Sequence, residues 1–203
     1  MRFGLNAFAA FALVSVVALP PAVEAAQSDP AAARIEAFNR SLVEVMKQGP
    51  ALGAAGRIRR LEPVVQDTFN LSLMTRYSVG PSWATMSESD HQALIRAFTR
   101  LTVASYAHNF DRFDGERFDV DPTVQTRGLD KVVSSHLTPR GRARVDLTYR
   151  MRLDGGEWKV VDVYYGAISQ LTTRRSDFAA PLASGGARAL LAHLEAASDK
   201  LLQ

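Results

Sequence analysis

The stretch VDLTYRMRLDGGEWKVVDVYYG, from Val145 to Gly166, predicts a strand, a tight turn and a second strand. Apolar and polar side chains alternate strictly from Val145 to Leu153, and successive side chains of a strand point to opposite faces of a sheet. Residues 154–156, Asp-Gly-Gly, are typical of the turn in a β-hairpin. The predicted hairpin therefore has one apolar face, which either closes a protein core or lines a cavity.

The pattern on both sides of the hairpin indicates an α+β protein. Residues 116–128 and 129–138 predict two further strands, and Pro122 in the first argues for an edge position or a bulge. With 139–153 and 157–166 they make a curved four-stranded antiparallel sheet, which helices cover on one face. Helical spacing of apolar residues, with breaks at QGPALGAAG and SGG, is found over residues 29–47, 57–80, 90–110, 167–182 and 187–203.

The N-terminal residues predict a secretory signal peptide. Arg2 precedes an apolar stretch from Phe3 to Leu19, and Val23-Glu24-Ala25 offers a small-x-Ala cleavage site. We expect cleavage after Ala25, which leaves residues 26–203 as a single exported domain. A retained membrane anchor is the alternative, although the apolar stretch is short for a span of about 20 residues.

Composition excludes several classes of protein. The 203 residues contain no cysteine, so neither disulfides nor thiol chemistry are available. The formal net charge of +3 is weakly positive, and no basic stripe with interleaved aromatic residues is present. Nucleic acid is therefore not expected as a partner, whereas anionic lipid or an acidic partner suits this charge better.

No catalytic or metal-binding motif is recognisable. The chain has no HExxH, no GxSxG and no glycine-rich phosphate loop, and His91, His108, His136 and His193 share no metal-ligand spacing. We therefore predict no cofactor and no enzymatic activity. The pair Arg174-Arg175 falls in a predicted helix, where a solvated face is the expected position.

Asp162 is the one acidic residue in an unusual place, because apolar residues flank it in VVDVYY. A buried carboxylate is costly unless it is paired or hydrogen-bonded. The favoured interpretation is structural: the carboxylate accepts hydrogen bonds and fixes the last strand to a helix. The alternative is a general base with a raised pKa that faces a pocket.

Four segments resemble the MlaC, or toluene-tolerance, family of exported lipid-binding proteins. They are FNLSLMTRYSVGPSW from Phe69, residues 92–120, GGEWKVVDVYYGAISQL from Gly155, and RRSDFAAPLASGGARALLAHL from Arg174. Within the family, MTRYSVGPSWATMS is most similar to the hopanoid-biosynthesis-associated branch, HpnM. Where the phospholipid branch has Asn-Tyr-Arg-Ser, this chain has Thr173-Arg174-Arg175-Ser176, which adds a positive charge.

The resemblance implies a monomeric periplasmic carrier that moves phospholipid or hopanoid between the inner and outer membranes. Its implied partners are an inner-membrane ABC/MCE-type lipid transport complex and an outer-membrane lipoprotein. The implied fold is NTF2-like and MlaC-like, with an apolar cavity that for a two-chain lipid needs roughly 1,000 Å³. The lipid-binding residues that we predict on this basis are Phe69, Leu73, Met74, Phe98, Leu101, Tyr106, Phe110, Val145, Leu147, Tyr149, Met151, Val161, Val163 and Tyr165.

Two other functions stay open at this point. One is an enzyme that acts on an apolar polycyclic substrate with Asp162 as its base. The other is a periplasmic adaptor with a closed core and no ligand. Hydrophobic periodicity does not distinguish them from a carrier, because a filled core and a lined cavity produce the same alternation of residues.

Overall fold

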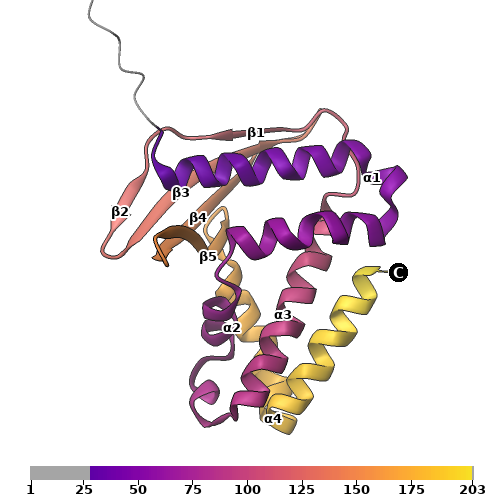
Figure 1. The fold of residues 1–203 in the computed structure, drawn as a ribbon, viewed down its shortest axis with the longest axis vertical. Helices are drawn as coiled ribbons and strands as arrows, with labels where there is room; N and C mark the ends of the chain where they lie inside the picture. Colours follow the sequence, from indigo (N-terminus) through magenta and orange to yellow (C-terminus); the bar gives the residue numbers. More distant parts are fainter. Residues whose placement is uncertain (1–27, 203) are drawn as a thin grey trace, which may run out of the picture.

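The computed structural model describes residues 28–202, so the predicted signal peptide, residues 1–25, lies outside the described residues. The fold is α+β, as expected, with one curved antiparallel sheet and helices packed beside it (Figure 1). Among the described residues no helix is both long enough and apolar enough to cross a bilayer.

The sheet has six strands in the described part of the chain, not the four that we expected. The additional strands arise because the first predicted strand is divided around Pro122, which lacks an N–H for the ladder, and because a two-residue strand follows the hairpin. The order is β1-β3-β4-β5-β6, and β2 also pairs with β3. The strands are β1 (Arg117–Val120), β2 (Gln125–Arg127), β3 (Asp130–Thr138), β4 (Val145–Asp154), β5 (Glu157–Tyr165) and β6 (Ile168–Ser169).

The hairpin of β4 and β5 is confirmed, and its register decides which side chains share a face. Leu147 pairs with Tyr165 and Tyr149 with Val163, so these four side chains lie on the inner face of the sheet. A register shift after Arg150 pairs Met151 with Val160 and leaves Val161 as the extra residue of a β-bulge. Gly155 and Gly156 both have positive φ, 58° and 87°, which suits a two-residue turn that follows the twist of the strands.

Helix α1 (Pro30–Thr68) runs across the sheet, reverses direction and returns (Figure 1). The reversal is at Gly53, whose φ of 61° is not helical, inside the QGPALGAAG stretch that we expected to break the helix. Arg57 fixes the returning half, because its guanidinium donates to the carbonyl of Gly49 at 3.1 Å and to that of Ala107 at 2.8 Å. Residues far apart in the chain are thereby joined where α1 reverses.

The remaining helices form the half of the molecule away from the sheet (Figure 1). Helix α2 (Leu71–Val79) leads through the 3₁₀ helix η1 (Gly80–Thr85) into α3 (Glu88–Asn109), whose capping box joins Ser87 and Asp90. Helix α4 (Gln170–Leu202) packs against α3 and is kinked at Gly185 and Gly186, the break that the SGG sequence predicts.

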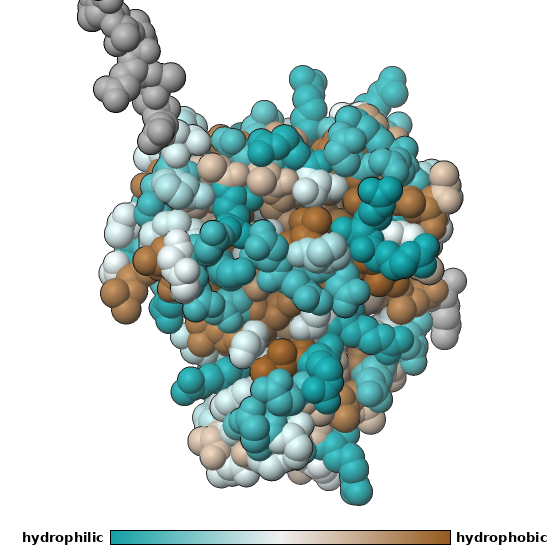
Figure 2. All heavy atoms as spheres, in the orientation of Figure 1, coloured by the Kyte–Doolittle hydropathy of each residue, from teal (hydrophilic) through white to brown (hydrophobic). Residues whose placement is uncertain are grey.

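The core extends from the inner face of the sheet and α1 into the space between α2, α3 and α4, and its upper part lies under the centre of the sheet. Leu147, Tyr149 and Met151 are buried there, together with Ile35 and Phe38 of α1. The centre of the sheet thus closes as ordinary core, and it removes apolar area from water as in any globular domain. Hydrophilic residues cover most of the face seen in Figure 2, and hydrophobic residues reach it only in small separate patches.

Candidate functional site

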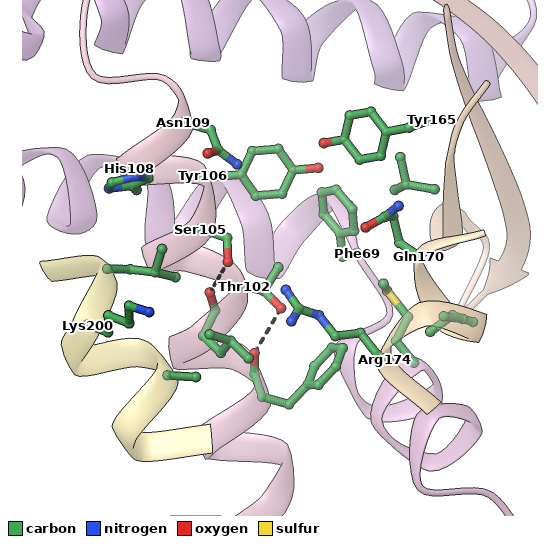
Figure 3. A pocket seen from close by; sticks show the side chains of 17 residues that line it. Phe69, Thr102, Ser105, Tyr106, His108, Asn109, Tyr165, Gln170, Arg174 and Lys200 are labelled. Atoms are coloured by element: carbon green, nitrogen blue, oxygen red, sulfur yellow. Dashed lines mark hydrogen bonds between the residues drawn. The ribbon is translucent and has the colours of Figure 1, made fainter. Parts of the chain in front are cut away.

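A cavity of about 630 Å³ lies below the sheet, between α2, α3, α4 and the end of β5. Figure 3 shows the side chains that line it, with α3 on one side and both ends of α4 contributing residues. The volume lies within the usual range for ligand cavities but below the roughly 1,000 Å³ expected for a two-chain lipid. The difference follows from the packed centre of the sheet, which leaves only the last residues of β5 to form cavity wall.

The deep part of the cavity is apolar. Phe98 and Leu101 of α3, Met74 of α2, Val163 of β5 and Leu171 of α4 line it, and all five are at least nine-tenths buried. Phe98 and Leu101 share a helix face because they are three residues apart. A thioether such as that of Met74 adapts its shape easily, which suits a wall that accommodates flexible chains.

An aromatic cluster supports the upper wall of the cavity. Phe69 and Tyr106 both line it, with ring centroids 5.6 Å apart, and Phe38 packs edge-on against each at 5.2 Å. Behind them Phe110 stacks on Tyr106 at 5.8 Å. Edge-to-face contacts of this kind hold rings in a defined orientation. The cluster therefore joins the core under the sheet to the cavity wall.

The mouth of the cavity is polar and carries positive charge. His108, Asn109 and Lys200 are exposed there, and the Arg174 side chain is 35% exposed. In Figure 3 Arg174 reaches from α4 toward Thr102 in the middle of the cavity, and Lys200 lies on the opposite side of the view. No aspartate or glutamate is among the described residues that line the cavity.

Hydroxyl groups inside the cavity are largely satisfied within the protein. Thr102 donates to the carbonyl of Phe98 and Ser105 to that of Leu101, each at 2.8 Å (Figure 3). Such bonds to the carbonyl four residues earlier are common for hydroxyls on helices. Because both hydroxyl donors are already used, the α3 wall does not need a polar ligand group to satisfy them.

Two tyrosines face one another across the upper part of the cavity. The hydroxyls of Tyr106 and Tyr165 point toward each other in Figure 3. Burial raises the pKa of Tyr106 well above its ordinary value, and the neighbouring Tyr149 and Tyr165 oxygens raise it further. Burial also raises the pKa of Tyr165, while the guanidinium of Arg174 acts in the opposite direction. These phenols therefore stay neutral at physiological pH.

Seven of the fourteen predicted lipid-binding residues line this cavity. They come from the C-terminal cap of α1, from α2 and α3, and from the end of β5: Phe69, Met74, Phe98, Leu101, Tyr106, Val163 and Tyr165. The other seven lie outside it: Leu73, Phe110, Val145, Leu147, Tyr149, Met151 and Val161. Of that second group, Leu147, Tyr149, Met151 and Val161 are buried in the core, and their contact with lipid stays a prediction.

Ten lining residues were missed: eight have polar or small side chains, which were not considered as wall, and two are leucines of α4. They are Thr102, Ser105, His108, Asn109, Gln170, Leu171, Arg174, Ala197, Lys200 and Leu201. A signal for the α3 members exists, since residues 98, 101, 102, 105 and 109 follow one helical face. Extending that face through its polar positions would have found them.

Asp162 points away from the cavity. It neighbours Val163, which lines the cavity, and adjacent strand residues face opposite sides of the sheet. Only 3% of Asp162 is exposed, and its carboxylate accepts hydrogen bonds from the Ser169 hydroxyl at 2.7 Å and the Leu171 N–H at 3.1 Å. It thus fixes β5 to the beginning of α4, which agrees with the structural interpretation and gives a general base no access to the cavity.

The four histidines lie apart in the fold. His91 stacks on Trp83 with ring centroids 3.9 Å apart, and His136 lies between Asp121 and Asp146. His193 packs edge-on near Phe178, while His108 stands at the cavity mouth. Within residues 28–202 no three side chains of the metal-ligating types gather into a site.

A second hollow of about 730 Å³ lies on another side of α3 and shares Phe69 with the cavity. Its walls carry charged residues of both signs, including Glu62, Arg96, Asp154 and Lys159. Opposite charges thus lie together in the wall of this second hollow, whereas the charged residues that line the cavity are all basic. The apolar floor and cationic mouth therefore make the first cavity the candidate site, and its arrangement suits an amphiphile with an apolar tail and a polar head.

Comparisons with known proteins agree with this geometry. The model of the family described as MlaC protein matches residues 36–196. Among solved structures, the fold is similar to that of a phospholipid-binding protein from Ralstonia solanacearum in complex with a phospholipid. The TM-score is 0.73 at 20% sequence identity, and the match covers 86% of this chain and 100% of the other.

Proposed function

Because the chain belongs to the MlaC family, we propose that it is a lipid carrier that shields acyl chains in the cavity while the headgroup stays at the mouth. The observation that carries the proposal is the division of the cavity into an apolar floor and a polar rim. Phe98, Leu101 and Val163 supply the floor, and Lys200 and Asn109 the rim. An amphiphilic ligand satisfies both parts at once.

The free-energy cost of moving an acyl lipid through water favours a carrier that shields its chains. Exposing an acyl chain to water costs about 0.8 kcal/mol per CH₂, so two chains of roughly thirty carbons in total cost roughly 25 kcal/mol. A cavity with the polarity of a bilayer interior removes that cost. It also keeps loading and unloading nearly balanced, because the chains gain little free energy on leaving one apolar environment for another.

The ligand class and the location extend the proposal. A phospholipid is supported by the ligand of the similar Ralstonia solanacearum protein. A hopanoid is the second candidate, supported by the resemblance of residues 74–87 to the hopanoid-associated branch. We further propose that the chain works in the periplasm, which the signal-like residues 1–25 support. As the resemblance to the MlaC family implies, it would act as a monomer that exchanges lipid with an inner-membrane ABC/MCE-type complex and an outer-membrane lipoprotein.

A transfer assay tests the carrier function. The protein is exported through its own N-terminal segment, purified without detergent, and added between donor vesicles with a fluorescent phospholipid and acceptor vesicles without it. The proposal predicts a transfer rate that rises in proportion to protein concentration. A rate equal to that of buffer alone, with no lipid bound to the recovered protein, would overturn the proposal and favour the ligand-free adaptor.

A further inference from the structure

We infer that the carrier selects lipids whose headgroup carries a net negative charge, and that Arg174 is the residue that selects them. The inference rests on the proposed function, since it assigns the class of lipid that the same cavity takes. It depends on where the positive charges lie relative to the apolar floor, and on the absence of carboxylates among the residues of 28–202 that line the cavity.

Arg174 stands at the boundary between floor and mouth. Its neighbours along the wall include Leu171, one helical turn earlier, which is buried. The guanidinium reaches toward Thr102, whose hydroxyl is already bonded to the carbonyl of Phe98 (Figure 3). A headgroup attached to chains on the floor would therefore meet the guanidinium as soon as it emerges from the apolar region.

The guanidinium is weakly engaged by the protein itself. The carboxylate nearest to it in the described chain belongs to Asp177, with 3.9 Å between Nη1 and Oδ2, which is beyond hydrogen-bond distance. Asp177 is 46% exposed in its side chain and is not part of the cavity wall. Arg174 thus retains donors for a ligand, and its planar fork matches a phosphate or carboxylate.

The rest of the mouth adds to this preference. Lys200 supplies a second cation, and Asn109 and Gln170 supply amide donors. Because the described lining residues include no aspartate or glutamate, a quaternary or primary ammonium on the headgroup finds no carboxylate in the cavity wall itself, and Asp177, outside the wall, already lies 3.9 Å from Arg174 Nη1. The ammonium of a zwitterionic headgroup would therefore have no carboxylate partner in the wall, whereas the negative charge of an anionic headgroup would pair with the Arg174 guanidinium.

A competition between two lipids with identical acyl chains tests the inference. The protein is incubated with vesicles that contain equal amounts of phosphatidylglycerol and phosphatidylcholine, and bound lipid is measured by native mass spectrometry. We expect about fivefold more phosphatidylglycerol on the wild type, as for one partly exposed charge-assisted pair. Arg174→Gln should lose most of this preference, and Arg174→Lys should keep most of it.

The control is Arg140→Gln, which removes the same charge from a side chain that is 77% exposed in the loop before β4. It should leave the preference at the wild-type value. Equal binding of the two lipids by the wild type would overturn the inference and leave the carrier function standing. A preference that Arg140→Gln lowers as much as Arg174→Gln would also overturn it, because net charge would then be the cause. Failure to bind either lipid would contradict the proposed function itself.

Discussion

Arg174 and Arg175 are neighbours in the chain, yet α4 gives them different surroundings. Arg174 lines the cavity, whereas the guanidinium of Arg175 lies so close to Gly80 that a Cβ there would stand 3.0 Å from Nη2. Gly80 has a φ of 70°, so the tight approach and the backbone conformation both favour glycine. The sequence predicts that both arginines face solvent. In the structure Arg174 belongs to the candidate site, and Arg175 packs α4 against the end of α2.

Ser105→Trp should abolish lipid uptake without unfolding the protein. Ser105 lines the middle of the cavity, and an indole there occupies space that the acyl chains need. We expect uptake from vesicles to fall at least about tenfold, with a thermal midpoint close to that of the wild type because Ser105 is only partly buried.

The matched control is Ser176→Trp. Ser176 also donates to the carbonyl four residues earlier, but it is exposed on α4. Its variant should take up lipid like the wild type. Equal uptake by both variants would show that acyl chains do not occupy this cavity.

Met151→Ala should lower stability rather than lipid binding alone. Met151 is 0% exposed in the core at the centre of the sheet, and truncation of such a residue costs about 2–5 kcal/mol of unfolding free energy. Leu201→Ala, at a half-buried position in the cavity wall, should cost about 1 kcal/mol or less and shorten the residence time of bound lipid. Urea unfolding of both variants makes the comparison. A Met151→Ala protein of wild-type stability that loses its lipid would place the cavity under the sheet centre instead.

Asp162→Ala should destabilise the junction between β5 and α4. The change leaves the buried Leu171 N–H without its acceptor and removes the partner of Ser169, so we expect a loss of about 1–3 kcal/mol in unfolding free energy. The control is Asp177→Ala, at an exposed position on α4. It should change the free energy of unfolding by less than about 0.5 kcal/mol. Were Asp162 a general base facing a pocket, its removal would instead leave stability unchanged.

Alkaline pH should destabilise the fold through its buried phenols. Burial raises the pKa of Tyr149 above its ordinary value, and the nearby Tyr165 oxygen adds to the shift. The unfolded state therefore loses this proton near pH 10 while the folded state keeps it, so stability holds below that pH and falls as pH rises above it.

The effect is measured as the thermal midpoint between pH 9 and 11.5. Each such tyrosine contributes a slope of up to about 1.4 kcal/mol per pH unit. Tyr149→Phe removes one ionisable group, and its midpoint should fall less steeply than that of the wild type. Identical slopes would mean that the Tyr149 hydroxyl is as well solvated in the folded protein as in the unfolded chain.

The sequence predicts the framework of the fold through local signals. Alternation from Val145 to Leu153 and the glycines at the turn define the hairpin, and the breaks at Gly53 and at Gly185-Gly186 coincide with the kinks in α1 and α4. Pro122 indicates an irregularity in the first predicted strand, and the structure divides that strand there into β1 and β2. Such signals act through backbone geometry, so one segment at a time suffices to recognise them.

The boundary between core and cavity could not be predicted from such local signals in the sequence. Met151 and Val163 have the same apolar character and lie on the same face of the sheet, but one is closed over by helices and the other lines the cavity. The β-bulge at Val161 and the position of α4 determine that Met151 lies in the core and Val163 in the cavity wall. Both depend on how distant segments of the chain pack. Arg174 was missed for a related reason, since a charged residue on a helix ordinarily faces water.

The proposed function requires that the cavity between α3, α4 and β5 holds a lipid. Its most direct test is native mass spectrometry of the protein exported through its own N-terminal segment and purified without detergent, followed by extraction of any bound material. A cavity that holds lipid should give a stoichiometric adduct that extracts as an acyl lipid or a hopanoid and that Ser105→Trp eliminates. A single mass equal to that of the bare chain, unchanged after incubation with vesicles, would contradict it.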